Sequence, residues 1–308
     1  MQARGLINSQ AIQHNMDWVW PYWVERQFDP SDESFLPRAF NLSHLNLTHR
    51  NWTAVGSPDS TELSIVDPRG LVTPFFDGWS IDQWVVTPEG FTLVPSRLKV
   101  IKQDFVIQGN PQVQTLAEDM GVQLRSRVES YWDEPVTMCR IKCSAFSPTG
   151  GWLAVSLRPY NPEGISFIHK ISLLKSRRGW KIDGHSTVHF DAIPDKTNYS
   201  KYWDGDVFAK ISLASAEDEV DCHVGLATAV ALFELKPNET RDVTVYVPIK
   251  KNHDAVPVER PEFIPTPKWN DNLQGLCELE IPNKQFKYLY DAAIRSLILH
   301  APLDIYPG

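Results

Sequence analysis

Two histidines and two aspartates alternate in one short segment of the chain. Asp183, His185, His189 and Asp191 all occupy odd positions. If the segment is a β-strand, successive side chains point to opposite faces, so these four share one face. Two imidazoles and two carboxylates can ligate zinc or another divalent cation. Metal sites usually draw ligands from more than one element. A polar face opposite a buried one is therefore the preferred interpretation, and we predict no bound metal or cofactor.

Aromatic side chains crowd the N-terminal segment around Pro21. Trp18, Trp20 and Trp23 lie within six residues of one another. Flat aromatic rings suit the apolar faces of sugars, so one hypothesis is a platform for an oligosaccharide or polysaccharide. The alternative is that the rings pack this arm onto the rest of the protein, because large aromatics dominate core and interface burial. We favour the packing role, and the same two readings apply to Trp79, Trp84 and Trp203.

A polar loop follows an apolar strand pattern in the middle of the chain. Arg158, Tyr160 and Asn161 precede Pro162 and Gly164, which fit the second and fourth positions of a type I turn. From such a loop the arginine and the tyrosine can reach a substrate or a second domain. They can equally hold a polar corner of the fold together. Both interpretations stay open at this point.

The elements that position these residues are mainly strands. Residues 122–132 alternate between apolar and polar side chains, as a half-buried antiparallel strand does. Pro- and Gly-rich turn signals separate the candidate strands. The fold class predicted from this pattern is mostly β, a large two-sheet antiparallel supersandwich. The other candidate strands are 98–108, 136–146, 152–157, 165–174, 186–193, 207–214, 224–235 and 242–249.

One strong helix is predicted near the C-terminus, after a stretch with four prolines at 257, 261, 265 and 267 that should run extended. Asn283 is a suitable N-cap, and Pro302 should end the helix near His300. The apolar residues share one face of this helix. They are Phe286, Leu289, Tyr290, Ala293, Ile294, Leu297 and Ile298, the apolar stripe.

The apolar stripe spans more than three turns and must be buried against something. It can lie across one sheet of the sandwich. Alternatively, its partners lie beyond Gly308, because the chain stops eight residues after His300 in a segment that resembles the start of a turn. We expect the second arrangement. It would be wrong if residues 1–265 covered the helix completely.

Composition excludes several classes of protein. The 308 residues contain 30 Lys plus Arg and 38 Asp plus Glu, a formal charge of −8, which argues against nucleic acid and anionic membranes as partners. The longest apolar stretch, 224–233, is too short to span a bilayer. The N-terminus lacks the apolar region of a signal peptide, so we predict a cytoplasmic protein. Its four cysteines should be free, buried thiols.

Four segments together resemble a known family. They are Thr48–Thr53, Val66–Leu71, Arg158–Ile165 and Ala301–Gly308. Their sequences are similar to the N-terminal part of bacterial six-hairpin glycosidases of the glucoamylase and glycogen-debranching kind, over Phe35 to Gly308. The resemblance implies a β-supersandwich followed by a linker and an (α/α)6 barrel, whose first helix begins much as residues 283–300 do.

The resemblance also implies where the chemistry lies. In such enzymes the acid/base carboxylate pair is carried by the helical barrel, and the motif rich in Phe, Trp, Arg and Asp expected soon after residue 308 is absent here. No catalytic residue therefore carries over to this chain. Asp204, Asp206 and the acidic run 217–221 supply carboxylates, but sequence spacing does not fix the distance of about 5 to 9.5 Å that hydrolysis requires. No GxSxG, P-loop, GxGxxG or paired CxxC motif occurs.

The leading hypothesis is thus a non-catalytic sandwich domain, inactive alone, that packs on a helical-barrel catalytic domain in cis or in trans and shapes its substrate cleft. The partner ligand would be an oligosaccharide or polysaccharide. Two alternatives are a self-sufficient sugar-binding sandwich and a complete metal-dependent enzyme built around His185 and His189. The predicted boundaries are 1–34 for the aromatic arm, 35–255 for the supersandwich, 256–282 for the Pro-rich linker and 283–308 for the first barrel helix.

Overall fold

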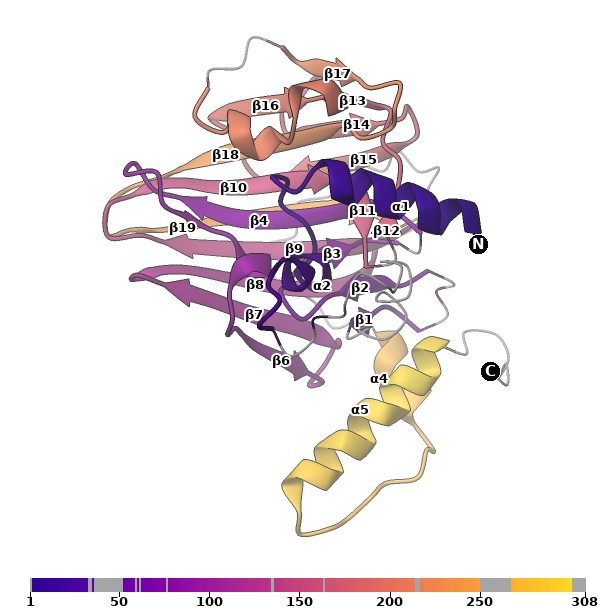
Figure 1. Ribbon diagram of the computed structural model, residues 1–308. Helices are drawn as coiled ribbons and strands as arrows, with labels where there is room; N and C mark the ends of the chain where they lie inside the picture. The colour runs from indigo at the N-terminus through magenta and orange to yellow at the C-terminus, as the bar shows by residue number, and fades with distance from the viewer. Residues whose placement is uncertain are drawn as a thin grey trace.

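The computed structural model describes most of the chain and shows two antiparallel sheets packed face to face, with a helix at the C-terminal end (Figure 1). This confirms the predicted mostly-β sandwich. The described residues are 2–32, 35, 52–58, 60, 62–75, 77–133, 136–162, 164–213, 217–249 and 267–300.

The first sheet has eight strands, in the order β1-β2-β3-β4-β10-β18-β16, with β5 paired to β4. Its central strand, β10, pairs with β4 and β18, so that Val155 lies opposite Gln83 on one side and Ala231 on the other. The strands are Thr53–Val55 (β1), Ser64–Val66 (β2), Val72–Thr73 (β3), Ser80–Val86 (β4), Thr92–Leu93 (β5), Gly151–Arg158 (β10), Lys196–Ser200 (β16) and Thr228–Leu235 (β18).

The second sheet has nine strands, in the order β17-β13-β14-β15-β19-β9-β8-β7-β6. Its longest pair, β8 and β9, places Val128 opposite Ile141. The strands are Lys102–Val106 (β6), Gln112–Asp119 (β7), Val122–Asp133 (β8), Val136–Phe146 (β9), Lys170–Leu173 (β13), Gly179–Ile182 (β14), Ser186–Phe190 (β15), Glu219–Asp221 (β17) and Thr240–Pro248 (β19). A short hairpin, Tyr160–Asn161 (β11) with Gly164–Ile165 (β12), stands apart from both sheets.

The main core lies between the inner faces of the two sheets. Leu153 and Phe233 from the first sheet and Ile141, Val188 and Val245 from the second are fully buried in one apolar cluster. The alternation predicted along 122–132 is the reason: in β8, the odd residues Arg125 and Arg127 face water while the even ones are buried. Burial of each large apolar side chain stabilises the fold by about 1.5–3 kcal/mol.

Two predicted strands are wrong in part. Residues 207–214 begin as a 3-10 helix, η4 (Val207–Lys210), because Asp206 accepts a hydrogen bond from the backbone N–H of Phe208 and caps it. The strand predicted over 165–174 is divided between β12 and β13. The other short 3-10 helices are Arg26–Phe28 (η1), Pro95–Arg97 (η2) and Tyr202–Asp204 (η3).

Helices flank the sandwich at both ends of the chain. The arm forms α1 (Gln2–His14) and α2 (Tyr22–Glu25), neither of which was predicted. The predicted extended stretch, 257–267, lies outside the described residues except for Pro267, where a short helix, α4 (Pro267–Leu273), begins. The predicted C-terminal helix is confirmed as α5 (Lys284–His300). Asn283 caps it, accepting hydrogen bonds from the N–H groups of Gln285 and Phe286 at 3.0 and 3.1 Å.

Candidate functional site

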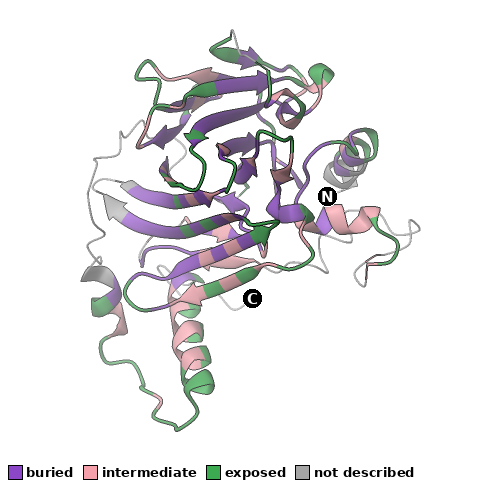
Figure 2. Ribbon diagram, turned by 90° about the vertical axis from the view of Figure 1, so that its left-hand side faces the viewer, coloured by how far each residue is buried: buried purple, intermediate pink, exposed green. Residues whose placement is uncertain are grey.

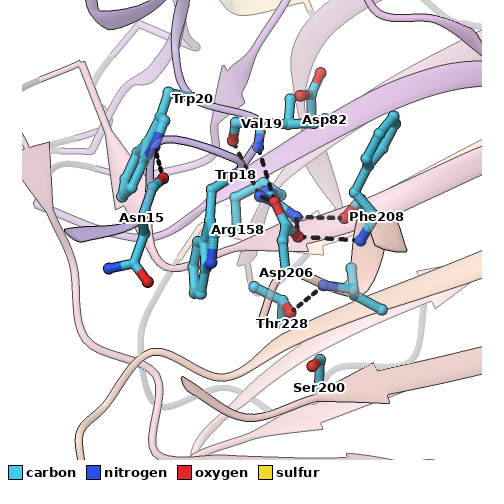
Figure 3. A network of polar contacts seen from close by, with 12 residues as sticks. Asn15, Trp18, Val19, Trp20, Asp82, Arg158, Ser200, Asp206, Phe208 and Thr228 are labelled. Carbon is cyan, nitrogen blue, oxygen red and sulfur yellow. Dashed lines mark hydrogen bonds and ion pairs between the residues drawn. The ribbon is translucent and has the colours of Figure 1, made fainter. Parts of the chain in front are cut away.

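The polar loop residues lie in a buried network rather than at an open surface (Figure 3). Arg158, at the end of β10, is 0% exposed and forms a bidentate ion pair with Asp206. Its Nη1 lies 2.6 Å from Asp206 Oδ1, its Nη2 donates to Oδ2, and its Nε donates to the hydroxyl of Tyr160 at 3.0 Å. Bidentate arginine–carboxylate pairs are among the strongest polar contacts in proteins.

The same network holds the N-terminal arm. The backbone N–H of Val19 donates to Asp206 at 2.8 Å, and its carbonyl accepts hydrogen bonds from Arg158 and from the Tyr160 hydroxyl. The guanidinium carbon also lies 5.3 Å from the ring centre of Trp84. The arm is thus fixed at Val19 to two segments distant in sequence, residues 158–160 and Asp206. Because Arg158 and Tyr160 are buried inside this chain, they form a polar corner and offer no surface to a substrate.

Electrostatics explain why this buried charge is stable. Burial alone would lower the pKa of Arg158, but the adjacent Asp206 carboxylate reverses the shift, so the pKa is raised overall and the guanidinium stays charged. Burial raises the pKa of Asp82 to about 6, although the Arg158 charge and a hydrogen bond from the Trp84 indole oppose that shift. Asn161, from the same loop, donates to the carbonyl of Gly78 at 2.8 Å and is also buried.

The tryptophans of the arm form a second core rather than a sugar platform. Trp18, Trp20 and Trp23 are all buried in a cluster with Tyr160. The rings of Trp18 and Trp20 stack at 5.7 Å, and the Trp20 indole donates to the carbonyl of Asn15 at 2.7 Å. The packing interpretation therefore describes these rings, and the platform hypothesis is wrong for them because no ring face is accessible.

The four candidate metal ligands do not share a strand face. Asp183, at a positive φ of 48°, and His185 belong to the turn that precedes β15. Asp183 accepts from the backbone N–H groups of His169 and Lys170, whereas the His189 ring contacts Thr187 at 3.0 Å. Asp191 follows the strand. Across the described ranges, no three His, Cys, Asp or Glu side chains are grouped closely enough to hold a metal ion.

The apolar stripe of α5 faces water. Phe286, Leu289 and Leu297 are 61%, 52% and 66% exposed. The helix contacts the sandwich through other residues: the Tyr288 hydroxyl donates to the Phe105 carbonyl at 2.5 Å, and Leu299 is 3% exposed. Figure 2 shows the helix extending from the sandwich in the colours of exposed and intermediate residues, whereas the strands are largely buried. Within the described residues, Phe286, Leu289, Ala293 and Leu297 of the stripe are therefore exposed, whereas Tyr290, Ile294 and Ile298 are half-buried.

Two cavities open at the end of the sandwich beside α1. A cavity of about 450 Å³ there is lined by Asp77, Trp79, Asp183 and His185 among others, and an adjoining one of about 270 Å³ contains Trp203. Sequence reasoning named Trp203 only alongside two buried tryptophans. The exposure of Trp203 could have been predicted from the polar turn that follows it, Asp204-Gly205-Asp206. Turns of this composition lie at the surface and place a neighbouring side chain there.

Three other sequence predictions can be compared with the structure. Cys139, Cys143 and Cys222 are free and buried as predicted, but Cys277 is exposed because it lies in the segment between α4 and α5. Burial raises the pKa of the Cys139 thiol to about 12, which leaves it unreactive. In the part of the chain that is described, no helix is both long and apolar enough to cross a membrane. The cytoplasmic location stays a prediction.

Comparisons with known proteins give likeness of fold only. No family model matches the sequence, and no curated protein matches it. A bacterial glucoamylase solved in complex with acarbose is similar at a TM-score of 0.45 and 8% identity, over 64% of this chain and 33% of that one. A family GH92 α-mannosidase from Bacteroides thetaiotaomicron is similar at a TM-score of 0.41 and 9% identity, over 79% of this chain and 35% of that one. The chain spans about a third of the length of these two structures, and likeness at this level assigns neither a family nor an activity.

Proposed function

We propose that this chain is the non-catalytic β-sandwich domain of a glucoamylase-like glycoside hydrolase, and that α5 docks on a helical catalytic domain whose substrate cleft the sandwich helps to shape. The outward apolar stripe of α5 carries the docking part of the proposal. The class of enzyme rests on the resemblance of the four sequence segments. The same proposal includes a cytoplasmic site of action and the assignment of residues 283–308 to the first helix of the helical-barrel domain.

The stripe supports docking because of the energy that its burial would release. Removing a Phe or Leu side chain from water is favourable by about 1.5–3 kcal/mol. Phe286, Leu289 and Leu297 follow one face over three turns, which is the pattern by which a helix packs into the groove of other helices. The sandwich itself uses a different side of the helix, so one docked helix can contact both domains at once.

The buried carboxylates support a non-catalytic role. Asp67, Asp82 and Asp206 lie within the fold, out of reach of a substrate, and Asp206 is neutralised by Arg158. A glycosidase requires two carboxyl groups that face each other across an accessible cleft, which none of these three does. These three side chains serve the structure of the sandwich instead. Asp77 and Asp183 line an open cavity and are the carboxylates that the turnover assay below tests.

Turnover assays on the purified chain test the non-catalytic part. We expect no release of glucose from maltooligosaccharides by residues 1–308. Clear turnover that disappears on substitution of a single carboxylate would overturn the proposal. Sequencing the coding DNA after codon 308 adds an independent test, since the proposal expects an open frame that encodes helices rich in Trp, Phe, Arg and Asp.

Association tests the docking part. Where such a downstream segment exists, the chain should co-purify with it when the two are co-expressed. The double variant Leu289→Ser/Leu297→Ser should lose this association while retaining the circular dichroism spectrum of the sandwich. Val100→Ser is the matched control, because Val100 is an equally exposed apolar residue away from α5. Equal association of all three proteins would show that the stripe is not the docking surface.

A further inference from the structure

The two cavities at the end of the sandwich adjoin each other. They share the side chains of Ile7 from α1 and of Ile165 and Phe167 from the segment that begins with β12. We call them together the end cleft. Cavities of a few hundred Å³ are of the size that holds small organic ligands. The end cleft lies apart from the Arg158 network, which is sealed, and uses no residue of α5.

Exposed aromatic rings line this cleft. Trp203 is 77% exposed and Phe167 47% exposed, in contrast to the buried tryptophans of the arm. Trp203 is braced by Tyr202, whose ring lies 5.0 Å away at 75°, and Phe167 lies 6.1 Å from the His169 ring. Large apolar groups gathered at an exposed cleft mark a binding surface. Their π faces, which carry partial negative charge, suit the C–H-rich face of a sugar ring.

Hydrogen-bond acceptors lie beside these rings. Asp183 uses Oδ1 to accept from two backbone N–H groups, at 2.9 and 2.7 Å, and its Oδ2 has no hydrogen-bond partner in the described part of the chain. His185 Nδ1 lies 2.8 Å from the Asp183 carbonyl, which can only accept, and in the neutral ring that donates through Nδ1 the other nitrogen, Nε2, can accept a hydrogen bond. Both residues line the larger cavity. A carboxylate oxygen and an imidazole nitrogen suit the paired O–H donors of a sugar.

The charges of the lining select against an anion. Two carboxylates, Asp77 and Asp183, line the cleft, and neither Lys nor Arg does so among the described residues. A phosphate or uronic acid would therefore be repelled. A purely apolar ligand would leave the acceptors without partners, which is costly on burial. An uncharged polyhydroxylated ligand meets both conditions.

We infer that the end cleft binds a neutral oligosaccharide, with Trp203 and Phe167 stacking on sugar rings and Asp183 and His185 accepting hydrogen bonds from hydroxyl groups. This site stands independently of the proposed docking of α5. It also assigns sugar stacking to the rings on η3 and the segment after β12 rather than to the buried tryptophans of the arm.

Isothermal titration calorimetry on the full chain tests the inference. The probes are three neutral oligosaccharides, namely maltoheptaose, mannohexaose and cellohexaose, together with an anionic oligogalacturonate. We expect at least one neutral probe to bind with a Kd in the millimolar range or tighter, and the oligogalacturonate not to bind. Trp203→Ala should weaken binding about tenfold or more, and His185→Ala by a smaller factor.

The matched control is Val100→Ala, which truncates a similarly exposed apolar side chain outside both the end cleft and α5 and should leave the affinity unchanged. Because Trp203 is so exposed, its variant should keep the stability of the parent chain, which thermal unfolding verifies. The inference is overturned if no neutral probe binds at millimolar concentration, if only the anionic probe binds, or if Trp203→Ala binds as tightly as the parent chain. These readouts involve neither hydrolysis nor α5, so they succeed or fail separately from the proposed function.

Discussion

The N-terminal arm and α5 are both appended to the sandwich, but they are attached in opposite ways. The arm buries its apolar rings and is also held by a charged network. Asp206 accepts a hydrogen bond from the Val19 N–H, and Arg158 donates one to the Val19 carbonyl. Helix α5 turns its apolar stripe outward and contacts the sandwich through Tyr288 and Leu299. One segment is complete within the described chain, whereas the other keeps its most apolar face uncovered.

This difference distinguishes an interface that is buried within the described chain from a surface that is exposed in it. A buried ion pair is tolerated only when its hydrogen bonds are satisfied, so the network of the arm indicates a permanent contact. The exposed apolar side chains of α5 are the part of the molecule that the proposed docking would bury. The following variants test each attachment, in order of expected effect.

The largest effect should come from Asp206→Ala, which leaves the buried Arg158 charge without its partner. We expect the free energy of unfolding to fall by about 3–5 kcal/mol, as measured by urea denaturation. Asp204→Ala, two residues away, breaks only the partly exposed pair with Lys210 and should cost at most about 1 kcal/mol. Similar losses for both variants would mean that the network does not secure the arm.

Asp67→Asn should change how stability depends on pH. Burial raises the pKa of Asp67 to about 7, above its ordinary value near 4, so the folded state holds this proton more tightly than the unfolded state. The resulting stabilisation is complete below pH 4 and is lost as the pH rises through 7. Between pH 5 and pH 8, the unfolding free energy of the parent chain should fall by roughly 2–3 kcal/mol relative to Asp67→Asn.

The control for this pH series is Asp119→Asn, at an exposed position at the end of β7. Its pH profile should run parallel to that of the parent chain. Parallel profiles for Asp67→Asn as well would contradict a buried, protonated Asp67.

Leu299→Ala should loosen α5. Leu299 packs closely against Gly56: a β-carbon added to Gly56 would lie only 2.9 Å from the Cδ2 atom of Leu299. Truncating this buried side chain should reduce the free energy that holds the helix to the sandwich by about 2–3 kcal/mol, read as faster hydrogen exchange over 284–300. Leu297→Ala, on the exposed stripe, should change the same free energy, measured by hydrogen exchange, by less than about 0.5 kcal/mol. The reverse order would mean that the stripe, not Leu299, faces the sandwich.

The smallest effect is expected from Tyr288→Phe, which removes the hydrogen bond to the Phe105 carbonyl. Docking of α5 should weaken by about 0.5–1.5 kcal/mol in the same exchange measurement. Tyr290→Phe is the control, because its hydroxyl bonds the Cys277 carbonyl within the C-terminal segment and does not touch the sandwich. If the two variants behave alike, the Tyr288 contact contributes nothing to docking.

Local patterns in the sequence predicted much of the fold. The alternation in β8 and β9 follows from side chains two residues apart sharing a face, and α5 follows from apolar residues three and four apart behind an Asn cap. The strand predicted over 207–214 was wrong because a local polar contact prevailed over the apolar pattern. The Asp206 carboxylate accepts a hydrogen bond from the backbone N–H of Phe208, and residues 207–210 form η4 instead.

The candidate site was less predictable because its residues meet only in space. The positions of Asp183 and Asp191 imply a common strand face, but a positive φ at Asp183 begins a turn that the alternation does not reveal. The burial of Trp18 and the exposure of Trp203 depend on where each segment meets the sandwich. Residue type is the same in both cases, so composition cannot separate a buried ring from an exposed one.

The sequence by itself determined the mostly-β class, the helix at 284–300 and the apolar stripe on that helix, because each depends on contacts within a few residues along the chain. Only the tertiary structure decided that Arg158 pairs with Asp206, 48 positions away, that the arm is sealed, and that the stripe faces water. Among the residues that the structure describes, those outcomes depend on the order and register of the strands in two sheets, which bring distant segments together and leave part of one helix face exposed.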